Sequence, residues 1–190
     1  MHVVADALDL NEQHEAAAGI YEHHLANLQR SRPDNTGCIL DAKNNLADCY
    51  NSLDRHQDAL HLMRQVYRES VDLDGREDRG TLISAGLLGL CLIRNKLFVE
   101  AKRFLRKELS LAQEALGRDH NATLNLSSYL YQALDEDPKS TREDLVEAER
   151  IITDTVQRRR RVFGPAHPDT REVEDYLAKV REKLARMYPG

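Results

Sequence analysis

Tryptophan is absent from this 190-residue sequence, which also holds only 9 glycines and 5 prolines. A turn-rich β-sandwich needs more glycine and proline, whereas the abundant alanine, leucine, glutamate, arginine and glutamine favour helix. The apolar fraction of 41% is too high for a disordered tail, and the length fits about one domain. The composition therefore predicts an all-α fold.

Cysteine and long apolar runs are also scarce. The three cysteines, Cys38, Cys49 and Cys91, are too few and odd in number for a disulfide framework, which indicates a reducing compartment. The longest nearly apolar run, at 83–93, is too short to span a bilayer. No basic segment followed by an apolar one opens the chain, so we expect no signal peptide. We expect a cytoplasmic protein without membrane contact, with the nucleus as the alternative.

The formal net charge is −5, which argues against non-specific binding of nucleic acid. The sharpest basic run is Arg158, Arg159, Arg160 and Arg161, and arginine side chains match phosphates and carboxylates. Two alternatives stay open for this run. It forms a basic contact surface, or its members point around most of a helical turn and serve only to stabilise a helix C-terminus.

Self-similarity is the strongest signal in the sequence. Residues 45–59 align with 87–101 at a spacing of 42, which pairs Ala47 with Gly89 and Cys49 with Cys91. The segment Leu-Gly-Arg-Asp-His-Asn-Ala-Thr at 116–123 returns 47 residues later as Phe-Gly-Pro-Ala-His-Pro-Asp-Thr at 163–170. The pair Glu-Ala at 100–101 also recurs 47 residues later. Two independent markers therefore share one period and one five-residue insertion, which predicts a repeat array.

Each repeat is predicted to be a pair of helices, because apolar residues recur at steps of three and four. The expected helices are 12–30, 38–53, 56–73, 80–94, 97–116, 121–134, 142–162 and 168–187. The expected fold is a single α-solenoid domain over 1–190, a right-handed superhelix with units 1–37, 38–79, 80–120 and 121–166 and a capping helix at 167–190. Because the array begins within a unit, we expect a longer parent chain.

Local residues support these boundaries. Gly117 and Gly164 follow helices, and Thr141 begins a capping signal after the polar insertion at 135–143. Asp169 and Thr170 follow Pro168 and are expected to offer side-chain oxygens to the first amides of the last helix. Gly86 and Gly89 lie inside a helix, where they predict a close helix crossing.

Residues 45–59, 116–123 and 163–170 resemble tetratricopeptide repeats (TPRs) of the kinesin-light-chain class. The resemblance rests on Asn-Leu-Ala-x-x-Tyr at 45–50, on alanine at the second-helix crossing and on the Leu-Gly-x-x-His-Pro-x-Thr connector. Asp54 and Asn121 depart from it, since they replace the usual glycine and proline. Similar connectors occur in the helical tails of SET/MYND-type methyltransferases. The resemblance implies a superhelix whose concave face binds a peptide.

The repeat register predicts which residues line that face. They are Asp41, Asn44, Asp48 and Asn51 in the first full unit, Ile83, Gly86, Leu90 and Ile93 in the next, and Asn125, Ser128, Gln132 and Asp135 in the third. Carboxamides can pair with an extended peptide backbone, and the isoleucines and leucine would form an apolar pocket. The alternative is that this apolar set packs against neighbouring helices. Kinesin light chains bind acidic peptides through basic residues of their groove. The set predicted here is acidic and amide-rich, so we do not expect this chain to share that preference.

No pattern for catalysis, metal binding or a cofactor is present. The sequence has no glycine-rich phosphate loop, no Gly-x-Ser-x-Gly elbow and no His-Glu-x-x-His helix. His14, His23 and His24 are expected to face solvent, and His120 and His167 belong to the connectors. Cys49 and Cys91, at equivalent repeat positions, are expected to pack in the core.

The function that the sequence predicts is a non-catalytic scaffold that binds a peptide or helix of a partner protein in a concave groove. The first alternative is a regulatory tail of a larger enzyme, such as a SET/MYND-type methyltransferase. The second is a nucleic-acid contact through the basic run at 158–161. The sequence predicts neither the partner nor the oligomeric state.

Overall fold

The computed structural model describes residues 14–188, and within that range the chain forms eight α-helices and no strand. The helices are α2 (His14–Ser31), α3 (Thr36–Ser52), α4 (His56–Asp74), α5 (Arg79–Arg94), α6 (Phe98–Ala115), α7 (Asn121–Asp135), α8 (Arg142–Phe163) and α9 (Pro168–Met187). Every predicted boundary in the described range lies within two residues of the observed one. Three predictions concern residues outside the described range. They are the start of the first helix at residue 12, the absence of a signal peptide at the beginning of the chain, and the last two residues of the capping segment.

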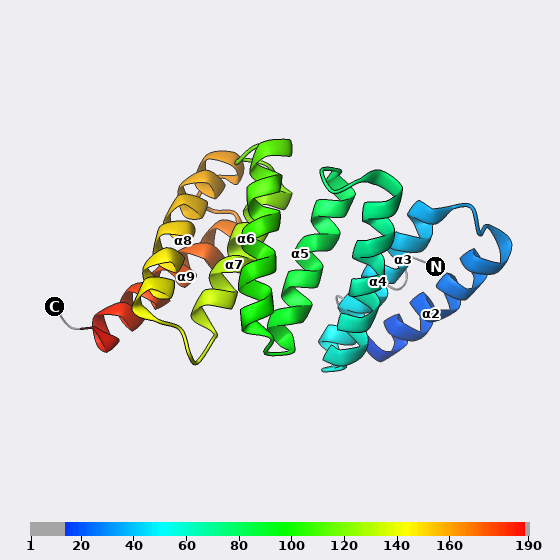
Figure 1. Ribbon diagram of the computed structural model, residues 1–190, viewed down its shortest axis with the longest axis horizontal. Helices are drawn as coiled ribbons and strands as arrows, with labels where there is room; N and C mark the ends of the chain where they lie inside the picture. The colour runs from blue at the N-terminus through cyan, green and yellow to red at the C-terminus, as the bar shows by residue number, and fades with distance from the viewer. Residues whose placement is uncertain (1–13, 189–190) are drawn as a thin grey trace. The chain divides into compact units, whose positions relative to one another are not determined.

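The chain forms two compact units, Met1–Arg76 and Glu77–Gly190. The described part of the first unit holds α2, α3 and α4, where α2 packs on α3 and α3 packs on α4 (Figure 1). Ala17, Ala18 and Tyr21 of α2 meet Leu46 and Cys49 of α3 in its core. Burial of Cys49 agrees with the core position that the repeat alignment predicts.

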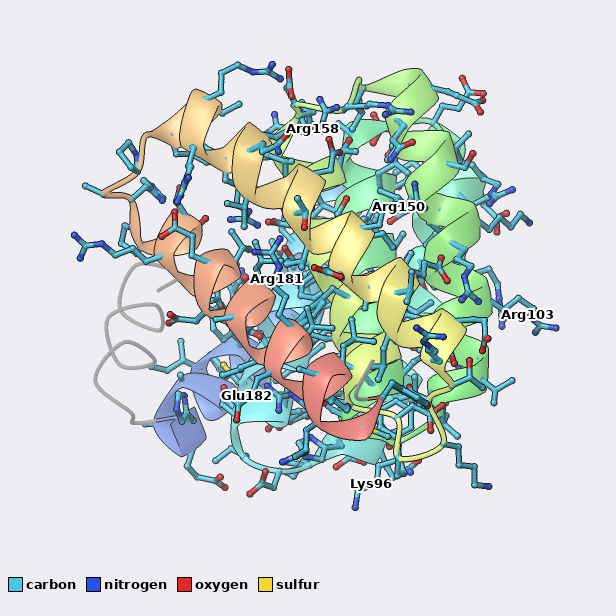
Figure 2. All side chains as sticks on the ribbon, turned by 90° about the vertical axis from the view of Figure 1, so that its left-hand side faces the viewer. Lys96, Arg103, Arg150, Arg158, Arg181 and Glu182 are labelled. Carbon is cyan, nitrogen blue, oxygen red and sulfur yellow. The ribbon has the colours of Figure 1, made fainter. Side chains whose placement is uncertain are left out.

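The second unit holds α5 to α9. Helix α5 packs on α6 and α7, α7 packs on α6 and α8, and α8 packs on α9 (Figure 1). An ion pair of 2.8 Å between Arg181 Nε and Glu149 Oε1 joins α9 to α8, and Figure 2 shows Arg181 on the C-terminal helix. Cys91 is fully buried in this unit, as the alignment predicts. The first helices of successive pairs, α5, α7 and α9, thereby offer one shared face.

Helices α5 and α6 approach closely at Gly89. A Cβ atom placed there would lie 2.3 Å from Leu105 Cδ2 of α6, and Leu105 is fully buried. At Gly86, a Cβ atom would lie 3.3 Å from Tyr129 Cε2 of α7. The predicted close crossing is confirmed. Gly89 allows α5 to approach α6 within one repeat, and Gly86 allows α5 to approach α7 of the following repeat.

Histidines of the repeat connectors begin two of the helices. His120 Nδ1 accepts a hydrogen bond of 3.2 Å from the Ala122 backbone N–H, and His167 Nδ1 accepts one of 3.2 Å from Asp169. The prediction that Asp169 and Thr170 cap α9 was wrong, because the histidine before Pro168 occupies the N-cap position. The connector histidines therefore have a structural role that their recurrence reflects.

The capping signal at Thr141 is confirmed as a reciprocal pair. The Asp144 backbone N–H donates to Thr141 Oγ1 at 3.2 Å, and the Thr141 backbone N–H donates to Asp144 Oδ2 at 3.3 Å. These two bonds satisfy donors that a helix start leaves open. They fix the end of the five-residue insertion against the start of α8.

A buried cluster of charges holds the insertion in place. Lys102 Nζ of α6 lies 2.9 Å from both Asp137 Oδ2 in the insertion and Asp144 Oδ2 of α8. Burial alone would raise the pKa of Asp137, but hydrogen bonds from Lys102 and from the Lys139 backbone N–H outweigh it and hold that pKa below its ordinary value. The same balance between burial and the Lys102 hydrogen bond lowers the pKa of Asp144. We name Lys102, Asp137 and Asp144 the insertion clamp.

Two of the turns between paired helices, α3–α4 and α5–α6, use a positive φ angle without glycine. Asp54 has φ of 58° and Lys96 has φ of 59°, at positions 42 residues apart. Asp54 is the residue that replaces the usual glycine of the resembled family. Side chains with a Cβ atom are strained there by about 1 kcal/mol.

Replacing Lys96 by glycine is therefore expected to raise the free energy of unfolding by up to about 1 kcal/mol, because glycine adopts this φ without strain. Part of the gain is lost to the greater freedom of glycine in the unfolded chain. Urea denaturation followed by circular dichroism measures the effect. Lys179→Gly, inside α9, serves as the control and should destabilise by about 1 kcal/mol. Equal losses in both variants would contradict this account of Lys96.

Candidate protein-interaction surface

The shared face of α5, α7 and α9 carries a row of half-buried side chains. Leu87, Tyr129 and Tyr176 lie one repeat apart in the sequence, at spacings of 42 and 47 residues. Leu87 and Tyr129 line one hollow, and Tyr129 and Tyr176 line a second. The two hollows share Asn125 and Tyr129, so they form one continuous surface that we name the inner face.

The first hollow, between α5 and α7, is apolar and small, at about 40 Å³. Ile83, Leu87 and Tyr129 form its walls together with Gly86. Ile83 is 41% exposed, although it lies on a largely buried helix. The hollow therefore presents exposed aliphatic and aromatic surface beside the amide of Asn125.

The second hollow, between α7 and α9, is polar and holds about 180 Å³. Its most buried charge is Arg159, which reaches it from α8 and has a side chain only 4% exposed. One guanidinium nitrogen of Arg159 donates to Asn125 Oδ1 at 2.8 Å, and another lies 2.9 Å from Asp169 Oδ2. Arg159 thereby connects α7, α8 and α9 and fixes the orientation of the Asn125 amide.

Tyr176 is held at the rim of the polar hollow by two hydrogen bonds. Gln132 Nε2 donates to the Tyr176 hydroxyl at 3.2 Å, and that hydroxyl donates to Glu172 Oε1. Burial and the bond to Glu172 raise the pKa of Tyr176 to about 12. Its ring stacks on Tyr131 with a centroid separation of 5.1 Å. Tyr176 therefore stays protonated and rigid at neutral pH.

The predicted site residues of the second unit fall into two groups. Ile83, Asn125, Ser128 and Gln132 line the hollows, together with Gly86. Leu90 is half-buried and lines neither of them. Ile93 was predicted to line the groove, but it is 2% exposed and lines neither hollow, which agrees with the alternative that it packs against neighbouring helices.

Asp135, the last residue of the predicted set, pairs with α9. Lys183 Nζ lies 2.9 Å from Asp135 Oδ1 and also donates to the Asp135 backbone carbonyl. The carboxylate is therefore occupied by a neighbouring helix.

The remaining predicted residues lie on α3, in the first unit. Asp41 and Asp48 are exposed, and Asn44 and Asn51 are half-buried. Their spacing of three and four residues places them on one side of the helix. Their role in binding stays a prediction.

The basic run at 158–161 is compensated by acidic partners from several elements. Arg158 pairs with Asp119 and Asp154, Arg159 with Asp169, Arg160 with Glu174 and Arg161 with Asp119, at 2.6–2.9 Å. The Arg158 side chain lies at one end of α8 in Figure 2. Arg159 points into the unit while its neighbours lie at the surface. A contact role for this run stays untested.

Sequence reasoning missed Tyr129, Glu172 and Tyr176, and it named Arg159 only as a member of the basic run at 158–161. Tyr129 and Tyr176 are equivalent to Leu87 in the repeat register, so extending the predicted lining by one position would have found both. Glu172 is equivalent to Asn125, but α9 was treated only as a cap. The sequence did not distinguish Arg159 from its three neighbours, because its burial depends on contacts with two other helices.

Two searches among residues 14–188 returned no candidates. No group of three or more His, Cys, Asp or Glu side chains in this range is placed to hold a metal ion. No helix in the same range is both long and apolar enough to cross a membrane.

The alternating helix pairs and their shared inner face define the chain as an all-α helical repeat solenoid, and comparison with known proteins specifies the repeat. A tetratricopeptide repeat family model matches residues 140–169. The comparison with curated proteins finds no match.

Solved structures agree with the family model. The nearly identical TPR-like repeats of a protein assigned as a kinesin light chain in Podosopora anserina match with 19% identity and a TM-score of 0.71, over 100% of this chain and 95% of that one. BtubC (BKLC) from P. vanneervenii matches with 16% identity and a TM-score of 0.75, over 96% of this chain and 70% of that one. Residues 140–169 therefore match a tetratricopeptide repeat, and the chain has the fold of kinesin-light-chain-like TPR repeats. Such repeats generally mediate protein–protein interaction.

Proposed function

We propose that this chain is a non-catalytic scaffold that binds a peptide or a helix of a partner protein along the inner face of α5, α7 and α9. The observation that carries the proposal is the pair of adjoining hollows, one apolar and one polar, which share Asn125 and Tyr129. A peptide lying across them would contact, one after another, an aliphatic surface, an aromatic ring and side-chain amides. Protein interaction surfaces combine such groups.

The chemistry of the inner face suits an extended segment. Arg159 holds Asn125 Oδ1, which leaves the Asn125 amide nitrogen to donate to a peptide carbonyl. Ile83 and Tyr129 supply apolar contact for a small side chain, because the apolar hollow has only about 40 Å³. A surface of this size supports affinity on the order of micromolar.

A scaffold role fits the polar groups of the inner face. Asp169 is engaged by Arg159, and Glu172 accepts from Tyr176, so both carboxylates already serve the fold. General acid or base catalysis requires a group free to exchange a proton with a substrate. The proposal therefore includes no cofactor and no reaction. The alternative of a regulatory tail in a larger enzyme would use the same inner face to recruit a substrate.

The test is selection of peptides that bind the purified chain, from a displayed random library, followed by calorimetry on wild type and two variants. Ile83→Asp places a charge in the apolar hollow and is expected to weaken the selected peptides at least about tenfold, since a buried unpaired charge costs more than 1.4 kcal/mol. The fold should be unaffected, because Ile83 is already 41% exposed.

Val99→Asp is the matched control, because Val99 is a β-branched residue that is 82% exposed on α6, away from the inner face. It adds the same charge and should leave peptide affinity unchanged. Equal losses in both variants, a loss only in Val99→Asp, or the absence of any peptide with micromolar affinity would contradict the proposal.

A further inference from the structure

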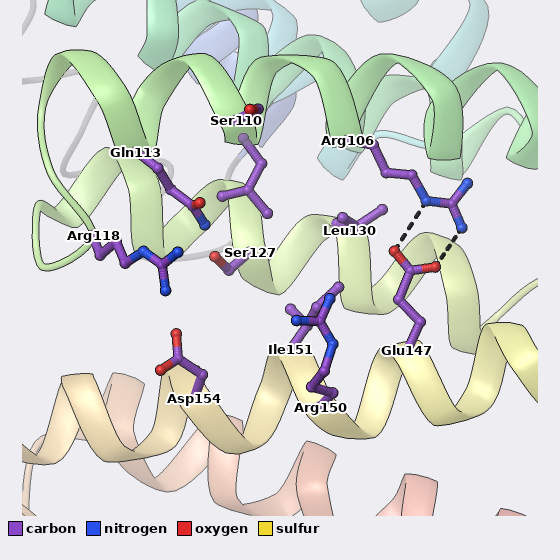
Figure 3. A pocket seen from close by; sticks show the side chains of 11 residues that line it. Arg106, Ser110, Gln113, Arg118, Ser127, Leu130, Glu147, Arg150, Ile151 and Asp154 are labelled. Atoms are coloured by element: carbon purple, nitrogen blue, oxygen red, sulfur yellow. Dashed lines mark hydrogen bonds and ion pairs between the residues drawn. The ribbon is translucent and has the colours of Figure 1, made fainter.

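Another hollow of the same unit, separate from the two of the inner face, lies between α6 and α8, with Ser127 and Leu130 of α7 at its base (Figure 3). It holds about 420 Å³ and does not share a residue with the apolar hollow of the inner face. We name it the outer hollow. Neither the family match nor the inner-face proposal accounts for it.

Three arginines from three different elements line the outer hollow. Arg106 comes from α6, Arg118 from the connector between α6 and α7, and Arg150 from α8. Figure 3 shows the guanidinium groups of Arg118 and Arg150 directed into the space between the two helices. Like charges that converge repel one another, and a bound anion would relieve that repulsion.

The acidic side chains of the hollow are already engaged. Arg106 donates two hydrogen bonds to the Glu147 carboxylate, of 3.0 and 2.6 Å. Asp154 accepts from Arg158 Nε at 2.7 Å, although it also faces Arg118 across the hollow in Figure 3. The side chains of Arg118 and Arg150 have no hydrogen bond or ion pair with any residue in the described range 14–188. The two exposed guanidinium groups are therefore without an ion-pair partner, with the Asp154 carboxylate as the nearest acidic group that faces Arg118.

Neutral polar groups complete the lining. Ser110 and Gln113 of α6 and Ser127 of α7 face the same space as the arginines. The Ser110 hydroxyl donates to Glu114 Oε1 and the Ser127 hydroxyl to the Thr123 carbonyl, so the Gln113 carboxamide is the neutral donor of this set that can reach an oxyanion. The hollow thus offers both charge and hydrogen-bond donors to one bound group.

The arginine set also recurs in the sequence. The positions 42 residues before Arg106 and Arg118 hold Arg64 and Arg76, and the position 47 residues before Arg150 holds Arg103. These offsets are those of the repeat itself. Recurrence of all three arginines at the repeat offsets indicates that the set is a feature of the repeat and not an isolated surface charge.

We propose that the outer hollow binds the phosphate group of a phosphoserine on a partner protein. A phosphate monoester carries close to two negative charges at neutral pH and three acceptor oxygens, which matches two arginines without an ion-pair partner. A single carboxylate would neutralise only one of them. The site acts independently of peptide binding on the inner face.

The test is titration of N-acetyl-phosphoserine amide into the isotopically labelled full chain at low, constant ionic strength, followed by backbone amide resonances. We expect saturable shifts at residues around Arg118 and Arg150, with a dissociation constant in the millimolar range. Arg118→Gln with Arg150→Gln should weaken binding at least about tenfold, because charge-assisted bonds to the phosphate are lost. Asp154→Asn should strengthen binding, since it removes a negative charge that faces Arg118.

Arg171→Gln with Arg186→Gln is the matched control, because it makes the same change in charge at two exposed positions of α9. Three results would overturn the proposal. They are the absence of saturable shifts, an equal loss in the control double variant, and N-acetyl-aspartate amide binding as tightly as the phosphoserine probe. Since every readout concerns the outer hollow, failure here leaves the test of the inner face unaffected.

Discussion

Replacing Lys102 by methionine is expected to lower the free energy of unfolding by about 3 kcal/mol at neutral pH, because it leaves a buried ion pair without its cation. Lys102 is 8% exposed, and its ammonium group lies 2.9 Å from two carboxylates. Without it, Asp137 and Asp144 lose the cation that pairs with both of them. Asp144 keeps only the longer contact of 3.5 Å with Arg106 and its capping bonds.

The loss should shrink as the pH falls. In the wild type, the pKa values of Asp137 and Asp144 lie below the ordinary value, so their stabilising contribution is present above about pH 4 and is lost below it. In the variant, burial without the lysine raises both pKa values, and protonation relieves the repulsion. The two proteins should therefore converge in stability between about pH 5 and pH 3.

Lys107→Met is the matched control, because it makes the same substitution at an exposed position of α6. Its effect should stay within about 0.5 kcal/mol at every pH. Urea denaturation of both variants between pH 3 and pH 7 measures the difference. A pH-independent loss in Lys102→Met would show that packing of the side chain, and not its charge, stabilises the insertion.

Replacing Gly89 by alanine is expected to lower the free energy of unfolding by about 2 kcal/mol, although alanine is the better helix former. The new Cβ atom would lie 2.3 Å from Leu105 Cδ2 and 2.9 Å from Leu105 Cγ, so the whole side chain must move. Leu105 is fully buried, so its movement would displace packed neighbours. Overpacking therefore outweighs helix propensity at this position.

Gly19→Ala provides the opposite result from the same substitution. A Cβ atom at Gly19 meets nothing within 4 Å, so only helix propensity acts, and stability should rise by up to about 1 kcal/mol. A double-mutant cycle of Gly89→Ala with Leu105→Ala measures the clash directly. We expect a favourable coupling of about 1–2 kcal/mol, because the smaller side chain makes room. If the losses of the two single variants simply add in the double variant, the cost of Gly89→Ala does not come from its contact with Leu105.

The sequence predicts the helices of this fold well because their signals are local. Periodic apolar residues, the Thr141 capping pair and the connector segments each act within a few residues, and the boundaries follow from them. Repeat equivalence added the close crossing at Gly89, which depends on only one neighbouring helix. It also predicted Ile83 and Asn125 as groove residues; both line the apolar hollow, and their role in binding stays a prediction.

Other features could not be predicted, because they depend on contacts between residues that are far apart in the sequence. Ile93 was expected in the groove, yet tertiary packing buries it. Arg159 belongs to a run whose members look alike in sequence, but only Arg159 is turned into the unit, where Asn125 and Asp169 meet it. Tyr176 was missed because its helix was assigned to capping alone. The insertion clamp joins residues 35 and 42 positions apart, a separation that no local pattern reports.

The insertion clamp also sets a limit on how far these repeats are interchangeable modules. The longer loop belongs to one repeat, whereas the lysine that secures it belongs to the repeat before. The position equivalent to Lys102 is Leu60 one repeat earlier and Glu149 one repeat later, and neither residue can supply the cation. A copy of residues 121–166 grafted after another repeat would therefore bring two buried aspartates without their lysine. In a consensus or shuffled array built from this chain, the order of the units is constrained by that one side chain.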